Sequence, residues 1–130
     1  MSKIIKHITK EIIIEDKNLT IKQLVEKAAR DKISLRYADL QYANLECANL
    51  DGADLRNANL WVANLSNSDL RNANLWLADL DGADLRNANL RDCNLRGADL
   101  DGCKFHKDQL KDLLKGLKIK VMKKKENDNT

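Results

Sequence analysis

The stretch from residue 33 to residue 107 is written in units of five residues, and this period limits what the chain can fold into. Fifteen consecutive units carry a large apolar residue at their centre, which is leucine from Leu35 to Leu100 and then Phe105. Two positions before the centre stands alanine in eleven units, and one position before it stands Asn or Asp in thirteen. The two positions after the centre vary.

Neither regular element accommodates this period. On an α-helix five residues advance by about 500°, so successive leucines would spiral around the axis. On a straight strand five is an odd number, so successive leucines would alternate between faces. Keeping every leucine inside requires the chain to turn a corner in each unit, and Asn, Asp and Gly suit such turns. The sequence therefore predicts a solenoid whose coils stack about 4.8 Å apart, with hydrogen bonds between coils.

The run of A-[DN]-L-x-x units over residues 33–107 resembles the pentapeptide-repeat proteins. The resemblance implies an all-β solenoid, specifically a right-handed quadrilateral β-helix with four units per coil. Leucine and the small residue would then point inward. Fifteen units would make nearly four coils, or roughly 18 Å of rod at the spacing of strands.

Residues 1–32 predict an N-terminal cap, because the open end of a solenoid exposes its core and unpaired backbone. Residues 1–7 are expected to be loose, and the β-branched segment 8–15 predicts a strand. Thr20 and Gln23 form a capping box that predicts the start of an amphipathic helix. This helix is expected to lie on the first coil.

Residues 108–122 predict a second cap, formed by a helix and a short strand over 117–121. The helix is expected to begin near Asp108 and to stop at Gly116. Residues 123–130 are expected to be a disordered tail. The apolar stripe of the helix would comprise Leu110, Leu113, Leu114 and Leu117.

The charge of the chain is nearly balanced but unevenly placed. The formal net charge is +3, made up of +3 in residues 1–32, −3 in residues 33–107 and +3 in residues 108–130. A weakly acidic rod between basic ends is not typical of a nucleic-acid-binding protein. The sequence has no signal peptide and no apolar run long enough for a membrane span. Three cysteines, two of them at inward repeat positions, indicate packed thiols in a reducing cytoplasm. The sequence therefore predicts a cytoplasmic protein that contacts neither nucleic acid nor membrane.

Large outward residues gather on two adjacent faces if residues twenty apart stack, with Tyr37 and Leu77 at the corner that the two faces share. Such patches often mark interfaces, so these residues form the candidate interaction patch. A homo-oligomer such as a dimer, a different protein partner, and a cover formed by segment 117–121 or 8–15 all remain open. Trp76 is expected to lie between the guanidinium groups of Arg56 and Arg96. The patch consists of Tyr37, Tyr42, Trp61, Val62, Trp76 and Leu77.

The repeats predict no catalytic, cofactor-binding or metal-binding site. A rod filled with leucine and alanine has no hollow in which a nucleophile and a base can meet, so the protein is not expected to be an enzyme. Cys93 and Cys103 take the place of inward alanines and are expected to be packed thiols. Four carboxylates on one face are expected to form a solvated acidic surface without the geometry of a calcium site. They are Asp79, Asp81, Asp99 and Asp101.

Three functions follow from this sequence. The favoured one is a non-catalytic interaction module that binds a protein partner or itself through its outer faces. The second follows from the resemblance, because the quinolone-protection members of the family imitate DNA and bind a type II topoisomerase, gyrase. Duplex DNA carries one negative charge per about 1.7 Å, far more than a block with a net charge of −3. The third is a purely structural solenoid without a partner.

Overall fold

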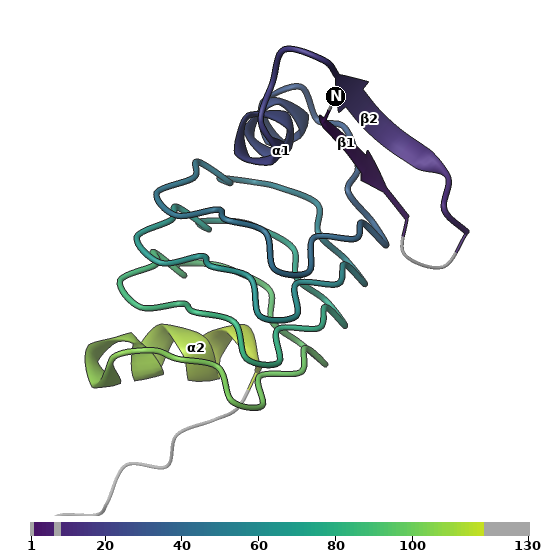
Figure 1. Ribbon diagram of the computed structural model, residues 1–130. Helices are drawn as coiled ribbons and strands as arrows, with labels where there is room; N and C mark the ends of the chain where they lie inside the picture. Colours follow the sequence, from purple (N-terminus) through teal and green to yellow (C-terminus); the bar gives the residue numbers. More distant parts are fainter. Residues whose placement is uncertain (1, 7–8, 119–130) are drawn as a thin grey trace, which may run out of the picture.

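The computed structural model describes residues 2–6 and 9–118. A hairpin and a helix lie at one end of a stack of coils, and a second helix lies at the other end (Figure 1). The elements are, in chain order, β1 (Ser2–Ile5), β2 (Ile12–Asp16), α1 (Ile21–Arg30), the 3₁₀ helix η1 (Lys107–Gln109) and α2 (Leu110–Gly116).

The coils have a repeat of twenty residues. Among the described residues, ten parallel bridges join residues twenty apart, from Asp39–Asn59 to Asp84–Lys104. The N–H of each central leucine from Leu35 to Leu85 donates to a carbonyl of the next coil, as in Leu60 to Asp79 at 2.8 Å. Four units therefore make one coil with four corners.

The amides of one unit explain why Asn or Asp precedes thirteen of the fourteen central leucines. In the unit from residue 58 to residue 62, Ala58 donates to the preceding leucine within a turn, and Asn59 donates to the coil before. Leu60 and Val62 donate to the coil after. The fifth amide, that of Trp61, lies at the corner and donates to Asn59 Oδ1 at 3.1 Å. A short side chain with an oxygen at this position thus satisfies the one amide that has no partner in the backbone.

The leucine column forms the core of the rod. Every central leucine from Leu35 to Leu95 is at most 2 % exposed. Phe105, the last residue of the apolar column, is 42 % exposed. No further coil follows Phe105 to cover it, because the chain turns into η1 two residues later.

The hairpin extends the first coil. Strands β1 and β2 pair antiparallel, and Ile4 is fully buried. The prediction of a loose segment 1–7 is therefore wrong for residues 2–6, and the strand predicted over 8–15 is found at Ile12–Asp16. The physical reason is that β1 pairs with the first coil. The N–H of Asp39 donates to the Ile5 carbonyl at 2.7 Å, which takes the place of the carbonyl that a preceding coil would supply.

Helix α1 closes the same end. The capping box is confirmed, since Thr20 Oγ1 accepts from the Gln23 N–H and Gln23 Oε1 accepts from the Thr20 N–H. Glu26 accepts the N–H of Asn49 at 2.9 Å. Since that amide belongs to the first coil, the Glu26 carboxylate satisfies one of its open groups.

Helix α2 and the turn before it replace the next coil at the other end. Gln109 Nε2 donates to the carbonyls of Leu85 and Ala88, and the N–H of Leu95 donates to the Gly116 carbonyl. Of the expected stripe, Leu113 is buried and Leu114 and Leu117 are half-buried, but Leu110 is 45 % exposed.

Residues 119–130 lie outside the described residues, and with them the tail predicted over 123–130. They also include most of the strand predicted over 117–121. In the described part of the chain no helix has the length and apolar character that a membrane span requires.

Candidate interaction surface

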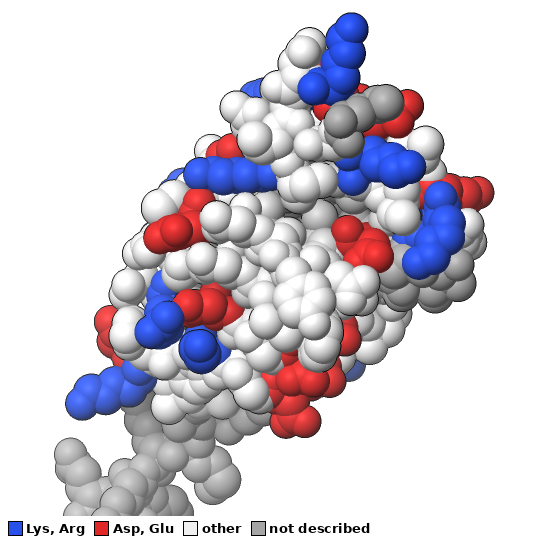
Figure 2. Space-filling view, viewed as in Figure 1, with Lys and Arg blue, Asp and Glu red and all other residues white. Residues whose placement is uncertain are grey.

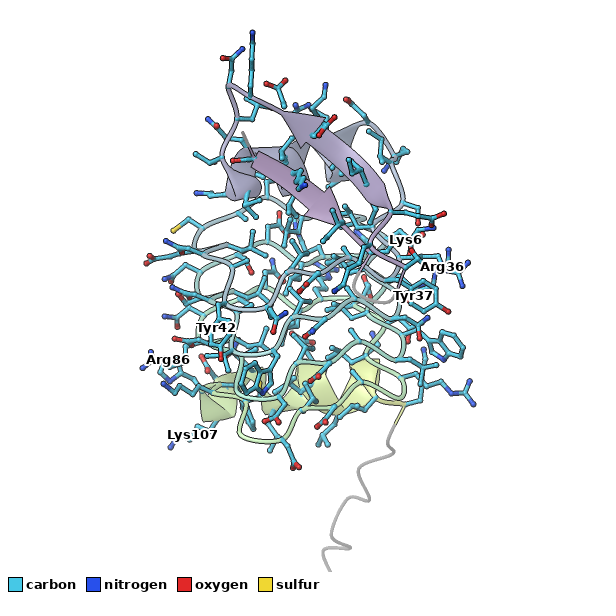
Figure 3. All side chains as sticks on the ribbon, turned by 45° about the vertical axis from the view of Figure 1, so that its right-hand side comes forward. Lys6, Arg36, Tyr37, Tyr42, Arg86 and Lys107 are labelled. Atoms are coloured by element: carbon cyan, nitrogen blue, oxygen red, sulfur yellow. The ribbon has the colours of Figure 1, made fainter. Side chains whose placement is uncertain are left out.

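Two neighbouring corners of the stack and the face between them hold the predicted patch. Corner A consists of the residue pairs 36–37, 56–57, 76–77 and 96–97, and corner B of the pairs 41–42, 61–62, 81–82 and 101–102. The AB face lies between these corners, and its outward residues are Asp39, Asn59, Asp79 and Asp99. Figure 3 shows Arg36 and Tyr37 at one side of the coil stack and Tyr42 toward the other side.

The structure brings the six predicted residues to these two corners and leaves most of them open. Trp61 and Trp76 are 37 % and 39 % exposed, and Tyr42 is 62 % exposed. The rings of Tyr42 and Trp61 meet edge to face with centroids 5.0 Å apart, which ties two successive coils together at corner B. The hairpin does not bury either tryptophan.

The cation–π contacts expected at Trp76 are not formed. Within the described part of the chain, the cation–π contact found is Arg36 over the ring of Tyr37, at 5.6 Å. Arg56 instead binds Asp54 through two hydrogen bonds of 2.8 Å each. A bidentate pair to a carboxylate two residues away holds the guanidinium more strongly than the face of an exposed ring.

The corner geometry forces a left-handed backbone at the second residue of each corner. All fourteen corners from 36–37 to 101–102 have a positive φ there, and nine of these residues are Gly, Asn or Asp, which tolerate it. Cys47 is one exception. The other four are the large side chains of corners A and B: Tyr37, Tyr42, Val62 and Leu77, with φ between 56° and 62°.

Two glycines make room for the aliphatic members of the patch. Val62 lies over Gly82, where an added Cβ would come within 3.2 Å of Val62 Cγ2. Leu77 lies over Gly97, where an added Cβ would come within 2.5 Å of Leu77 Cδ2. Sequence reasoning missed this relation, although a glycine twenty residues after each apolar corner residue is a readable signal.

Carboxylates on the other faces are neutralised within their own units. Asp54, Asp69 and Asp84 are each followed two residues later by an arginine that binds them at 2.6–2.9 Å. These hydrogen bonds to arginine hold the pKa of all three carboxyls below the ordinary value.

The acidic end of the AB face has no such pairing. Asp79 and Asp99 are followed two residues later by Asp81 and Asp101. None of the four is in an ion pair with another described residue. Figure 2 shows carboxylates gathered beside uncharged surface toward the C-terminal end of the stack.

The cysteines and acids offer no metal centre in the part of the chain that the structure describes. No group of three potential ligands comes together there. Burial raises the pKa of the Cys93 thiol to about 12, and burial of the Cys103 thiol raises its pKa to about 11. Both thiols therefore stay protonated at neutral pH, while Cys47 lies exposed at another corner.

The family model of pentapeptide repeats matches residues 33–72 and 68–106 of the chain, in eight copies. These two ranges cover more than half of the sequence. The chain is a pentapeptide-repeat protein. Its coil is accordingly the right-handed quadrilateral β-helix of that family.

Solved structures of similar proteins include alr5209, a pentapeptide-repeat protein from Nostoc PCC 7120. It is 39 % identical over 68 % of this chain and 77 % of its own, with a TM-score of 0.55. HetL, a pentapeptide-repeat protein from Nostoc sp. strain PCC 7120 involved in regulating heterocyst differentiation, is 41 % identical over 54 % of this chain and 35 % of its own, with a TM-score of 0.33. QnrB1, a plasmid-mediated fluoroquinolone resistance protein, is 30 % identical over 68 % of this chain and 45 % of its own, with a TM-score of 0.43. Among curated proteins none matches the chain.

Proposed function

We propose that this pentapeptide-repeat protein is a non-catalytic interaction module that binds a protein through the AB face and its two corners. The observation that supports this most directly is the placement of Tyr37, Tyr42, Val62 and Leu77. All four stand at left-handed backbone positions, and all four border this one face.

These positions have a cost in stability. A residue other than glycine loses roughly 1–2 kcal/mol in the left-handed region, and Asn or Asp loses less. The other two corners hold Asn, Gly, Asp or Cys at the same positions. Large side chains at corners A and B thus destabilise the isolated chain, and strain of this kind collects at functional sites.

The chemistry of these side chains fits a protein surface. Tryptophan and tyrosine are enriched at interfaces, where their rings contribute large contact areas. Trp61 and Trp76 already lie more than one third exposed on a rigid stack, so they need no rearrangement to meet a partner. The neighbouring face and corner residues supply polar groups around them.

The two alternative functions have less support. Imitation of DNA requires a continuous row of unpaired charges, whereas Asp54, Asp69 and Asp84 are neutralised by arginines of their own units. A purely structural solenoid gives no reason for strained apolar corners on one side only.

Site-specific photo-cross-linking tests the proposed function. Benzoylphenylalanine at position 59 samples the AB face, and the same group at position 89 samples the opposite face. The two positions are matched, because each asparagine accepts the corner N–H two residues later. We expect protein adducts from position 59 and none from position 89 in extracts of the source organism. Equal adducts, or none from either position, would refute the proposal.

A further inference from the structure

We propose that the partner on the AB face is a second copy of this chain, packed face to face with the two coil axes antiparallel. The two-fold axis would pass at the level of Asn59. This inference rests on the proposed function, because it names the occupant of the same surface.

The hairpin adds a further level to the AB face, on which Lys3 of β1 lies opposite Glu15 of β2. Strand β1 stacks on the first coil through the bridge between Lys6 and Ala38 and the hydrogen bond from Asp39 to Ile5. Residues of a strand alternate between its two sides, so Lys3 and Ile5 point outward opposite the buried Ile4. In Figure 3, Lys6 lies where the hairpin meets the first coil, close to Arg36 and Tyr37.

The surface therefore changes in character along the coil axis. The exposed cations Lys3 and Arg36 lie at the N-terminal end, and neither forms an ion pair with another described residue. The aromatic and aliphatic side chains lie in the middle. The unpaired carboxylates lie at the C-terminal end. They are Asp79, Asp81, Asp99 and Asp101, and the exposed Arg96 of corner A lies at the same end.

Such a surface is complementary to the same surface of a second copy whose coil axis runs in the opposite direction. In a two-fold interface each contact occurs twice, with the roles of the copies exchanged. An axis at Asn59 that reverses the coil direction places Lys3 of one copy near Asp99 and Asp101 of the other. It also places Trp61 of one copy against Trp61 of the other.

The same reversal matches corner A with itself. Arg36 and Tyr37 of one copy then face Trp76 and Leu77 of the other, which pairs a cation and a ring with an apolar surface. The alternative with parallel axes would set Asp39, Asp79 and Asp99 each against its own copy. In the antiparallel packing Asp39 meets Asp79, and Arg56 meets Arg56 of the other copy. Each Arg56 is already bound to Asp54, and the contacts of Lys3 oppose the repulsion between the two aspartates.

Both ends of the rod already have their open backbone groups satisfied in part. Glu26 and Ile5 accept amides of the first coil, and Gln109 donates to carbonyls of the last coil. End-to-end addition of coils would have to displace these contacts. The AB face requires no such displacement.

Charge reversal and mixing test this packing. Lys3→Glu and Asp101→Lys each place like charges in contact twice per dimer, whereas a mixture of the two variants restores opposite charges at both contacts. We expect the wild type to dimerise. The dissociation constant of each single variant should be higher by at least about tenfold, and the mixture should regain the wild-type affinity. Glu46→Lys, an exposed reversal at another corner, is the matched control and should dimerise normally.

Light scattering over a wide range of protein concentration gives the masses, and circular dichroism shows that each variant is folded. A wild type that stays at the mass of one chain would overturn the second copy as partner, while cross-linking from position 59 would still decide the proposed function. A dimer that withstands both reversals, or that is not restored by mixing, would overturn the antiparallel packing. Dissociation by Phe105→Ser alone would place the contact at the C-terminal end and would also overturn it.

Discussion

At the scale of single residues, the second residue of each corner has a positive φ, which some side chains tolerate and others adopt only with strain. Asn67 and Val62 occupy the same place in neighbouring units, and both have φ close to 57°. Asparagine tolerates this conformation, whereas a β-branched side chain is an outlier there. The free-energy cost of the strain can therefore be measured twice, by relieving it at Val62 and by introducing it at Asn67.

Val62→Asn is expected to stabilise the isolated chain by about 1 kcal/mol, because it relieves the left-handed strain of a β-branched residue. The reverse exchange, Asn67→Val, is expected to destabilise it by a similar amount. The free energy of unfolding from urea titration measures both. A lower free energy of unfolding for Val62→Asn would contradict the claim that the large corner side chains of this surface are strained.

The paired carboxylates give the protein a defined sensitivity to acid. The bidentate Arg71 lowers the pKa of Asp69 in the folded state, so the pair contributes stability above the unfolded pKa of about 3.9. This contribution is lost as the pH falls through the lower, folded pKa. We expect a melting temperature that is nearly constant from pH 7 to pH 5 and declines below about pH 4.

Asp69→Asn removes the negative charge but keeps the side-chain oxygen that forms the turn. Asparagine keeps the oxygen that accepts the Arg71 N–H, as it does in other units, but it does not titrate. The variant should be less stable at neutral pH and should lose less stability on acidification. An unchanged acid profile would show that this pair does not contribute.

The outward position of the candidate patch residues can be predicted from the sequence alone, but the contacts that their side chains make cannot. A period of five places Tyr37, Trp61 and Leu77 outward without any knowledge of φ. The contact expected between Arg56 and Trp76 fails because two surfaces compete for the same guanidinium, and the nearer carboxylate of Asp54 binds it. Such competition depends on distances that spacing does not supply.

At the scale of elements, the caps show how a solenoid ends without leaving open backbone groups. The side chain of Gln109 is buried and donates to the Ala88 carbonyl, which an amide of a further coil would otherwise occupy. The helix signals of both caps are legible in the sequence. Strand β1 is not, because a segment as short as Ser2–Ile5 is stabilised by its pairing with β2 and the first coil.

Gln109→Ala is expected to destabilise the protein by about 1–3 kcal/mol, because it leaves a buried carbonyl without a donor. Lys111→Ala, at an exposed position of the following helix, is the matched control and should change stability by less than about 0.5 kcal/mol. Thermal unfolding measures both. Equal effects would mean that Gln109 does not replace the missing coil.

At the scale of the whole molecule, each coil contacts only its neighbours, and the result is a rigid rod with flat sides. Rigidity matters for binding because side chains on such a side lose little freedom on association. The repeat and its core can be predicted from the sequence because the units share one pattern of a small, a polar and a large apolar residue. The partner does not, because the outward positions are free to vary without affecting the coil.

The mass of the protein in solution, with and without its tryptophans, tests the central claim most directly. The comparison is between the wild type, the variant Trp61→Ala/Trp76→Ala, and the control Glu46→Ala/Arg91→Ala at the other two corners. We predict the mass of two chains for the wild type and the control, and of one chain for the tryptophan variant. A wild type at the mass of one chain, or a dimer that is indifferent to the loss of both tryptophans, would contradict self-association through the AB face.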